Sequence, residues 1–339
     1  MHLGQNVGMA DTRPQARDFG GSGPWVGLSD TQRAIVLALL RHGRLSRPEI
    51  MKLVGISPGS ITRLTTPLVD NGILMARTER TACTGRPQSP LEVRADAESI
   101  IGVNLSGESL IAVLADLHLN VLATARRTLP GHAPADVVAS LTDAAIELTR
   151  SRPDAPAPSC ASVSLGAAAT DERTVTDAVF LGWHRVPLAE LVKTRLRMPT
   201  AVGNDLAAMT LQEAWFGAGR EHDRLVLITV GAGIGFGLVV GGEVITTPDA
   251  ELGLVGGIPV ADDGRPATSL PAMDCLTSPA IERAWSGQGR PPLPAARVVD
   301  LAKRGEAAAV AICSSYARRV GRLIAMAAAF ALPDVVVVA

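Results

Sequence analysis

Cysteine and aromatic residues are scarce in this 339-residue chain. It has four Cys, four Trp, five Phe and one Tyr. The cysteines lie far apart, at positions 83, 160, 275 and 313, and none belongs to a Cys-x-x-Cys pair. This pattern excludes a disulfide scaffold and the common zinc-finger spacings, and it favours a reducing compartment.

Long hydrophobic runs are also missing. Residues 1–28 are polar and Gly-rich, without the apolar segment of a secretory signal. The most apolar stretch, residues 323–339, is split by Pro333-Asp334 into pieces shorter than the ~20 residues that a membrane-spanning helix needs. We therefore expect a cytoplasmic protein without a membrane partner.

Charged residues make up 19% of the chain, and they are unevenly distributed around a net charge of −1. Residues 1–94 hold 12 basic and 7 acidic side chains, whereas residues 95–339 hold 20 basic and 26 acidic ones. A basic front and an acidic back predict at least two domains with different partners.

The basic part carries the start and stop signals of three short helices. Ser46-Arg47-Pro48-Glu49 is a capping box with proline in the first turn. Two strand-like runs follow the helices, over residues 73–77 and 91–94. The expected helices start after Ser29-Asp30, Ser46 and Ser57, and they end before Gly43, Gly55 and Asn71-Gly72.

This order predicts a winged helix-turn-helix over residues 29–94, after a disordered leader over residues 1–28. The third helix would present small polar groups to phosphates and Arg63 to a guanine edge. Gly85-Arg86-Pro87 lies between the strands, where Arg86 suits a narrow minor groove. A dimerising helical hairpin and a solvated turn are the alternatives. The predicted DNA-binding residues are Ser57, Ser60, Thr62, Arg63 and Arg86.

Residues 95–339 show an internal duplication. Three β-rich runs, then alternating helices and strands, precede three more β-rich runs that end near residue 246. This pattern predicts an α/β fold of two ribonuclease-H-like halves around a cleft, as in actin and sugar kinases. The halves are expected at about residues 95–205 and 206–339.

Motifs on both domains occur together in one order and spacing. They are Leu45-Ser46-Arg47 to Gly55-Ile56-Ser57, Gly85-Arg86-Pro87, Ile101-Gly102-Val103-Asn104-Leu105, Leu181-Gly182-Trp183, Asn204-Asp205, Phe216-Gly217-Ala218-Gly219 and Gly231-Ala232-Gly233-Ile234-Gly235. These segments resemble the ROK family (repressors, open reading frames and kinases) in its regulator branch. The resemblance implies a DNA-binding domain controlled by a sugar-kinase-like sensor, in a homodimer or homotetramer that governs carbohydrate genes.

The phosphate side of the kinase pattern is degenerate. Kinases of this fold hold Mg²⁺ with an Asp where this chain has Asn104, and a neutral amide is a poorer ligand. Residues 231–237 suit either an anion cradle or a hairpin of glycines with positive φ. The resemblance makes Asp205 a vestigial catalytic base and Asn204 a sugar ligand, although either side chain also suits a helix cap.

The family's zinc site is also degenerate. Its Glu-x-Gly-His segment reads Glu251-Leu252-Gly253-Leu254 here, and only two cysteines, Cys275 and Cys313, follow. Tetrahedral zinc needs four converging ligands, so we expect neither a metal nor a cofactor. The resemblance leaves Asn204, Asp205 and Glu251 as candidate ligand-binding residues. A sugar-like effector, a lost effector and control by a partner all remain open.

The expected C-terminal end is a helix over residues 304–331 followed by an apolar strand over residues 335–338. The family continues beyond this strand, so we expect an incomplete second half whose last strand lies at a sheet edge. Our main hypothesis is a non-enzymatic transcriptional repressor that binds double-stranded DNA. The alternatives are an ATP-dependent sugar kinase with Asp205 as base, and an oligomerising interaction protein.

Overall fold

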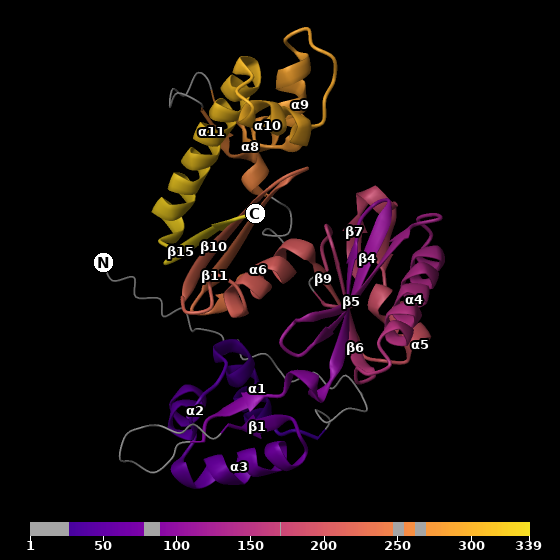
Figure 1. Cartoon of the computed structure of the whole chain (residues 1–339), viewed down its shortest axis with the longest axis vertical. Helices are drawn as coiled ribbons and strands as arrows, with labels where there is room; N and C mark the ends of the chain where they lie inside the picture. The colour runs from indigo at the N-terminus through magenta and orange to yellow at the C-terminus, as the bar shows by residue number, and fades with distance from the viewer. Residues whose placement is uncertain (1–26, 78–88, 170, 247–253, 262–268) are drawn as a thin grey trace, which may run out of the picture.

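The computed structural model describes residues 27–77, 89–169, 171–246, 254–261 and 269–339. These residues form a small helical unit at one end of the molecule and two larger lobes, each built around a β-sheet (Figure 1). Residues 1–26 of the expected leader, Gly85-Arg86-Pro87 and Glu251 lie outside the described residues.

The helical unit is the predicted winged helix-turn-helix. Ser29 and Ser46 form capping boxes with Gln32 and Glu49, and Gly55 ends the second helix in the left-handed region. Ser57 precedes the third helix as expected, but its hydroxyl makes no capping hydrogen bond. The elements are α1 (Asp30–His42), α2 (Arg47–Val54), α3 (Pro58–Asp70), β1 (Leu74–Ala76) and β2 (Leu91–Val93).

Apolar residues from every element of this unit share one core. The three helices contribute Ile35, Ile50 and Leu68, and the strands contribute Leu74 and Leu91. All five are at most 1% exposed. Burial of this kind, worth about 1.5–3 kcal/mol per large aliphatic side chain, holds three short helices together that would be unstable alone.

The first lobe is a five-stranded sheet in the order β5-β4-β3-β6-β9. Strands β3, β4 and β5 are antiparallel, whereas β6 and β9 run parallel to β3. Helix α4 packs on β4 and β5, and α5 packs on α4 and β9. The elements are η1 (Ala95–Ala97), β3 (Ser99–Leu105), β4 (Ser109–Asp116), β5 (Val121–Thr128), α4 (Pro134–Ser151), β6 (Pro158–Leu165), β7 (Val175–Ala178), η2 (Val179–Leu181), β8 (Trp183–Val186), α5 (Leu188–Leu196) and β9 (Thr200–Asn204).

The second lobe repeats the antiparallel triplet, in the sheet order β12-β11-β10-β15. Strand β15 lies parallel to β10 at the sheet edge, as the sequence predicts. The elements are α6 (Asp205–Trp215), β10 (Arg224–Val230), β11 (Ile234–Val240), β12 (Glu243–Val244), η3 (Leu254–Gly257), β13 (Pro259–Val260), β14 (Leu270–Pro271), α8 (Ala272–Cys275), α9 (Ser278–Ser286), α10 (Ala295–Lys303), α11 (Ala307–Ala331) and β15 (Val335–Val338).

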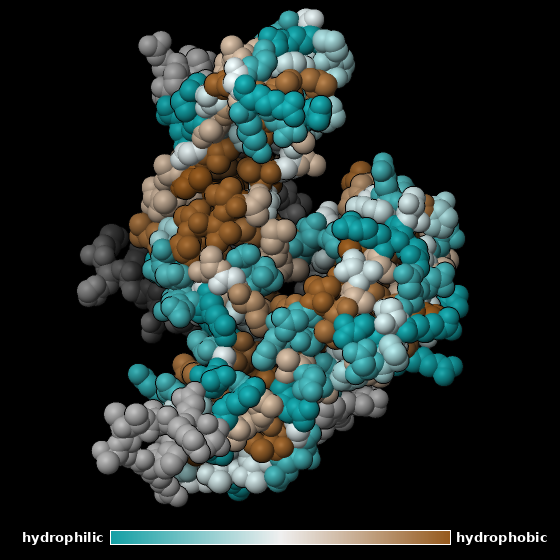
Figure 2. Space-filling view, viewed as in Figure 1, coloured by the Kyte–Doolittle hydropathy of each residue, from teal (hydrophilic) through white to brown (hydrophobic). Residues whose placement is uncertain are grey.

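Apolar side chains gather on the surface over the second sheet and the adjoining end of α11 (Figure 2). Phe330 is 87% exposed and Leu332 is 65% exposed.

The predicted continuous helix over residues 304–331 is wrong at its start. Gly305, at φ +86°, forms a turn that separates α10 from α11, and Glu306 caps α11.

Candidate nucleic-acid interface and interlobe cleft

Helix α3 has one buried face and one exposed polar face. Ile61, Thr65 and Leu68 point into the core, and the Thr65 hydroxyl donates a hydrogen bond to the Ile61 carbonyl at 2.9 Å. On the other side, Thr62 and Arg63 are exposed. An amphipathic third helix of this kind can enter a major groove without disturbing its own core.

The residues at the start of α3 continue this polar face. Ser57 is exposed and Ser60 is half-buried, and their hydroxyl oxygens lie 3.1 Å apart. Because the Ser57 hydroxyl is not used to cap the helix, its hydrogen-bonding capacity is directed toward Ser60 and solvent. The structure therefore places four of the five predicted DNA-binding residues on one surface, whereas Arg86 lies outside the described residues.

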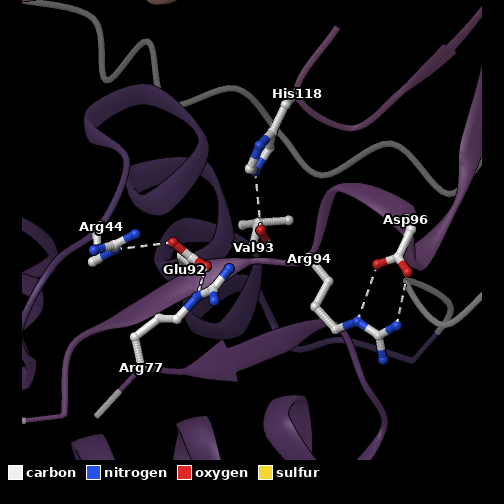
Figure 3. A network of polar contacts seen from close by, with 7 residues as sticks. All are labelled: Arg44, Arg77, Glu92, Val93, Arg94, Asp96 and His118. Carbon is white, nitrogen blue, oxygen red and sulfur yellow. Dashed lines mark hydrogen bonds and ion pairs between the residues drawn. The ribbon is translucent and has the colours of Figure 1, made fainter. Parts of the chain in front are cut away.

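The wing is a small sheet with a network of ion pairs on it. Strands β1 and β2 pair antiparallel, and Leu45 forms a bridge with Leu91 on the other side of β2. Glu92 accepts hydrogen bonds from the Nε atoms of Arg77 at 2.7 Å and Arg44 at 3.0 Å (Figure 3). Burial raises the pKa of Glu92, but the hydrogen bonds from Arg77 and Arg44 outweigh it and hold this pKa below its ordinary value.

The winged unit contacts the first lobe through the turn between β4 and β5. Leu117 donates a backbone hydrogen bond to the Ala95 carbonyl at 3.0 Å, and its side chain packs against the core of the winged unit. The Nε2–H tautomer of His118 donates to the Val93 carbonyl at 3.0 Å (Figure 3). The wing is thus tied to the first lobe by the side chains of Leu117 and His118.

The winged unit also contacts the second lobe, through the C-terminal end of α1. Arg220 donates from Nε to the Arg41 carbonyl at 3.0 Å. The Arg41 guanidinium lies against Gly242, where any side chain would overlap it, and Gly242 has φ +76°. Burial, followed by the charges of Arg41 and Arg220, lowers the pKa of His42. One small domain therefore bridges both lobes.

An open cleft of about 580 Å³ lies between the lobes. Gly166 follows β6, and Asn204 and Asp205 join β9 to α6. The remaining wall comes from α6, the β10–β11 hairpin and Ala339 after β15. Its lining residues are Gly166, Asn204, Asp205, Leu206, Met209, Thr229, Val230, Gly231, Ala232, Gly233, Ile234, Gly235 and Ala339. The structure therefore places Asn204 and Asp205 in the same cleft as the glycine-rich hairpin.

Asn204 and Asp205 are both engaged at the start of α6. The Asn204 Oδ1 atom accepts from the backbone of Leu206 at 2.9 Å and of Ala207 at 3.2 Å. Its Nδ2 atom donates to the Ala167 carbonyl at 3.3 Å. Asp205 Oδ1 accepts from the Leu206 backbone at 2.8 Å, and its side chain stays half-exposed. Asn204 is therefore the helix cap, and Asp205 is the more accessible of the two to a ligand.

The glycines of residues 231–237 form the predicted hairpin, but the expectation that they have positive φ is wrong. Close packing explains two of them instead. A Cβ at Gly235 would lie 2.5 Å from Thr229 Oγ1 and 2.8 Å from Leu206 Cδ1, and one at Gly237 would overlap Thr210 of α6. Glycine at these positions lets α6 press against β11.

Known families match both parts of the chain. The model of the ROK family matches residues 100–339, and a winged helix-turn-helix DNA-binding model matches residues 28–75. The chain belongs to the ROK family. Its ROK domain is the two-lobed part described above, and its winged helix-turn-helix carries the exposed face of α3.

Individual relatives include repressors and kinases. The chain is 28% identical over 254 residues to a putative xylose repressor of Caldicellulosiruptor sp. (strain Rt8B.4). This alignment covers 74% of this chain and 63% of that protein. It is 31% identical over 189 residues to a glucokinase of Thermotoga maritima (strain ATCC 43589 / DSM 3109 / JCM 10099 / NBRC 100826 / MSB8), covering 53% of this chain and 56% of that protein. The chain thus spans less than two thirds of the length of each.

The fold is also that of a solved ROK family transcriptional regulator, a homolog of the E. coli MLC protein. The two superpose with a TM-score of 0.75 at 21% identity, over 91% of this chain and 82% of that one.

Within the described ranges, no group of three or more His, Cys, Asp or Glu side chains is arranged to hold a metal ion. The helices of these ranges include none that is long and apolar enough to span a membrane.

Sequence reasoning missed the two junctions of the winged unit. Arg41, His118, Arg220 and Gly242 carry no motif, and the Arg41–Arg220 contact joins residues 179 positions apart. It also missed the wing cluster of Glu92 with Arg44 and Arg77. A local signal existed only for Gly242, because the pair Gly241-Gly242 after a strand is typical of a tight turn.

Proposed function

We propose that this protein is a DNA-binding transcriptional regulator, a repressor of carbohydrate-related genes whose ROK domain senses a sugar-like effector. The observation that carries the proposal is the exposed polar face of α3, with Thr62 and Arg63, on a winged unit attached to a ROK domain. The xylose repressor relative supports the carbohydrate assignment.

DNA recognition has two parts in this proposal. Ser57, Ser60 and Thr62 fix the register of α3 through phosphate contacts, and Arg63 reads a guanine edge. Arg86, on the connection between β1 and β2, enters the adjoining minor groove. The protein acts as a homodimer or homotetramer, so the operator is expected to contain two half-sites about one helical turn apart.

Helix α6 is the physical route from the effector to DNA. Its first residues line the cleft, and the helix contacts β6 and β9 of the first lobe, β11 and β12 of the second, and α1 of the winged unit. Because the winged unit is also held at His118 and Arg220, closure of the cleft must shift at least one of its two attachments. Asn204, Asp205 and Glu251 are the proposed ligand contacts.

The kinase motifs are proposed to be degenerate and the protein non-enzymatic. Asn104 is an amide rather than a carboxylate, and it donates to the Ser164 hydroxyl at 3.2 Å. Leu254 replaces the expected zinc-binding His, and the Cys275 thiol is buried and donates to the Leu270 carbonyl at 3.8 Å. These residues provide neither the hard-cation site nor the thiolate set that the chemistry needs.

The direct test is selection of DNA by the purified full-length chain from a pool of random duplexes, followed by sequencing. We expect a two-fold-related consensus that disappears with Arg63→Ala, whereas Arg86→Ala relaxes only its flanking A·T positions. Selection without enrichment would contradict the proposal. Lys52→Ala, on α2, is a matched control for loss of one exposed positive charge.

A second function, ATP-dependent sugar phosphorylation, is favoured by two observations. Asp205 and the glycine-rich hairpin line the same cleft, and a glucokinase of Thermotoga maritima is among the relatives. Sugar-dependent ADP release that is abolished by Asp205→Asn would establish it. Our proposal predicts no sugar-dependent ADP release from either the unmodified chain or this variant.

A further inference from the structure

The outer face of the wing carries a carboxylate held between two arginines. Glu92 is the middle residue of β2, which is the central strand of the wing. Arg44 precedes Leu45 on one side, and Arg77 follows β1 on the other. Leu91 and Val93 point into the core, so alternation along the strand places Glu92 on the outer face.

The three side chains differ in exposure. That of Glu92 is 14% exposed, whereas those of Arg44 and Arg77 are 46% and 56% exposed. Both arginines donate to the carboxylate from Nε, the guanidinium nitrogen nearest to the backbone (Figure 3). This hydrogen bond fixes the orientation of each guanidinium group. The Glu92 carboxylate thus contacts two cationic side chains at once.

A neighbouring pair shows the contrast. Arg94 donates to Asp96 through two nitrogens, at 3.2 Å and 3.1 Å, which gives a neutral one-to-one pair (Figure 3). Exposed pairs of this kind contribute little to stability. The cluster around Glu92 differs from this one-to-one pair, because one largely buried carboxylate orders two long cationic side chains at once.

The two arginines lie next to the segments of the winged unit that the proposed function places at the DNA. Arg77 is the last described residue before the connection between β1 and β2, which holds Arg86. Arg44 lies two residues before the cap of α2. The cluster thus joins the base of the wing to the segment that enters the helix-turn-helix.

We infer that Glu92 is a positioning residue that holds Arg44 and Arg77 as a preformed pair of DNA phosphate-binding groups. This inference rests on the proposed function. An exposed arginine loses much of its rotamer freedom when it binds a phosphate. Here that freedom is already lost in the folded protein, and the two guanidinium groups are held in a fixed spacing beside the wing.

The inference predicts the sign of one substitution. A carboxylate beside DNA repels phosphates, so its simple removal would strengthen binding. If Glu92 acts by ordering the two arginines, Glu92→Gln weakens binding even though it removes a negative charge. Asp96→Asn is the matched control, because it removes a neighbouring carboxylate that orders only Arg94.

The experiment is fluorescence anisotropy of the full-length chain on a labelled random-sequence duplex, across a salt titration. We expect Glu92→Gln to weaken binding about threefold to tenfold, because both arginines must then be ordered on binding. Asp96→Asn should leave binding unchanged or make it tighter. Arg44→Ala with Arg77→Ala should lower the slope of log K against log salt by about 1.8, since each phosphate contact contributes about 0.9.

Adding Glu92→Gln to that double variant should have no weakening effect, because the positioned groups are gone. Tighter binding by Glu92→Gln alone, or equal weakening in both backgrounds, would overturn the inference. If Glu92→Gln does not fold, Glu92→Asp replaces it, since a carboxylate one methylene shorter cannot hold both arginines. Absence of DNA binding by the unmodified chain would instead refute the proposed function.

Discussion

Replacement of Gly237 tests the close packing that builds the cleft. A Cβ at this position would overlap the Thr210 hydroxyl and lie 3.0 Å from both the Cβ and the Cγ2 of Thr210. Thr210 is fully buried on α6, and its hydroxyl donates to the Leu206 carbonyl at 2.7 Å. Neither side can yield without moving α6, so Gly237→Ala must displace the helix that begins with Asp205.

Overpacking of a filled interior costs about 1–3 kcal/mol. In a unit of this size each kcal/mol lowers the melting temperature by about 2–4 °C. Thermal unfolding followed by circular dichroism measures the shift. Gly203→Ala is the matched control, because a Cβ there meets no atom within 4 Å and its φ is not positive. We expect a clear loss of stability for the first variant and almost none for the second.

A double-mutant cycle identifies the cause. Thr210→Ala removes the hydroxyl and the methyl group that the new Cβ would meet, so Gly237→Ala should cost less in that background than alone. Equal melting temperatures for Gly237→Ala and the unmodified protein would refute the packing argument. If Gly237→Ala destabilises the unmodified protein and the Thr210→Ala variant equally, the strain does not arise from contact with Thr210.

Three further predictions concern single side chains. Arg63→Ala should lower affinity for the selected DNA by about 1–3 kcal/mol, measured by anisotropy, while random DNA loses far less. Asn204→Ala should destabilise the fold by about 0.5–2 kcal/mol in thermal unfolding, with Asn204→Asp retaining the cap and most of the stability. Because the pKa of Glu92 is lowered in the folded state, its stabilising contribution is present above the unfolded value of about 4.5 and is lost as the pH falls through the folded pKa. The melting-temperature difference between Glu92→Gln and the unmodified protein should therefore vanish in acid, and a constant difference would contradict this assignment.

The local parts of the fold were predictable from the sequence. Ser46 and Glu49 form the expected capping box, and the predicted strand over residues 335–338 is the edge strand β15. Such features depend on contacts within a few residues, or on an uninterrupted apolar run, and the sequence shows both directly.

Features that depend on distant partners were not predictable. Gly237 is glycine because Thr210 of another element approaches it, and a hairpin motif cannot show that approach. The contact of Arg220 with Arg41 joins two domains, and the two arginines have no complementary charge to indicate it. The short helices α8, α9 and α10 were also missed, because their stability comes from packing rather than from their own pattern.

The candidate site divides in the same way. The sequence predicted that Asn204 or Asp205 caps the following helix. Which of the two does so depends on the backbone N–H groups of Leu206 and Ala207, which donate to Asn204 at the start of α6. The exposed face of α3 followed from helical spacing alone.

The most direct test of the central claim is the affinity of the full-length chain for duplex DNA from upstream of its own gene. Fluorescence anisotropy at two salt concentrations, with a random duplex of equal length as control, gives the specificity ratio. A regulator binds the upstream DNA at least about 10³-fold more tightly than random DNA, and it keeps a specific excess at the higher salt. Equal binding to both duplexes that disappears with salt would contradict the account.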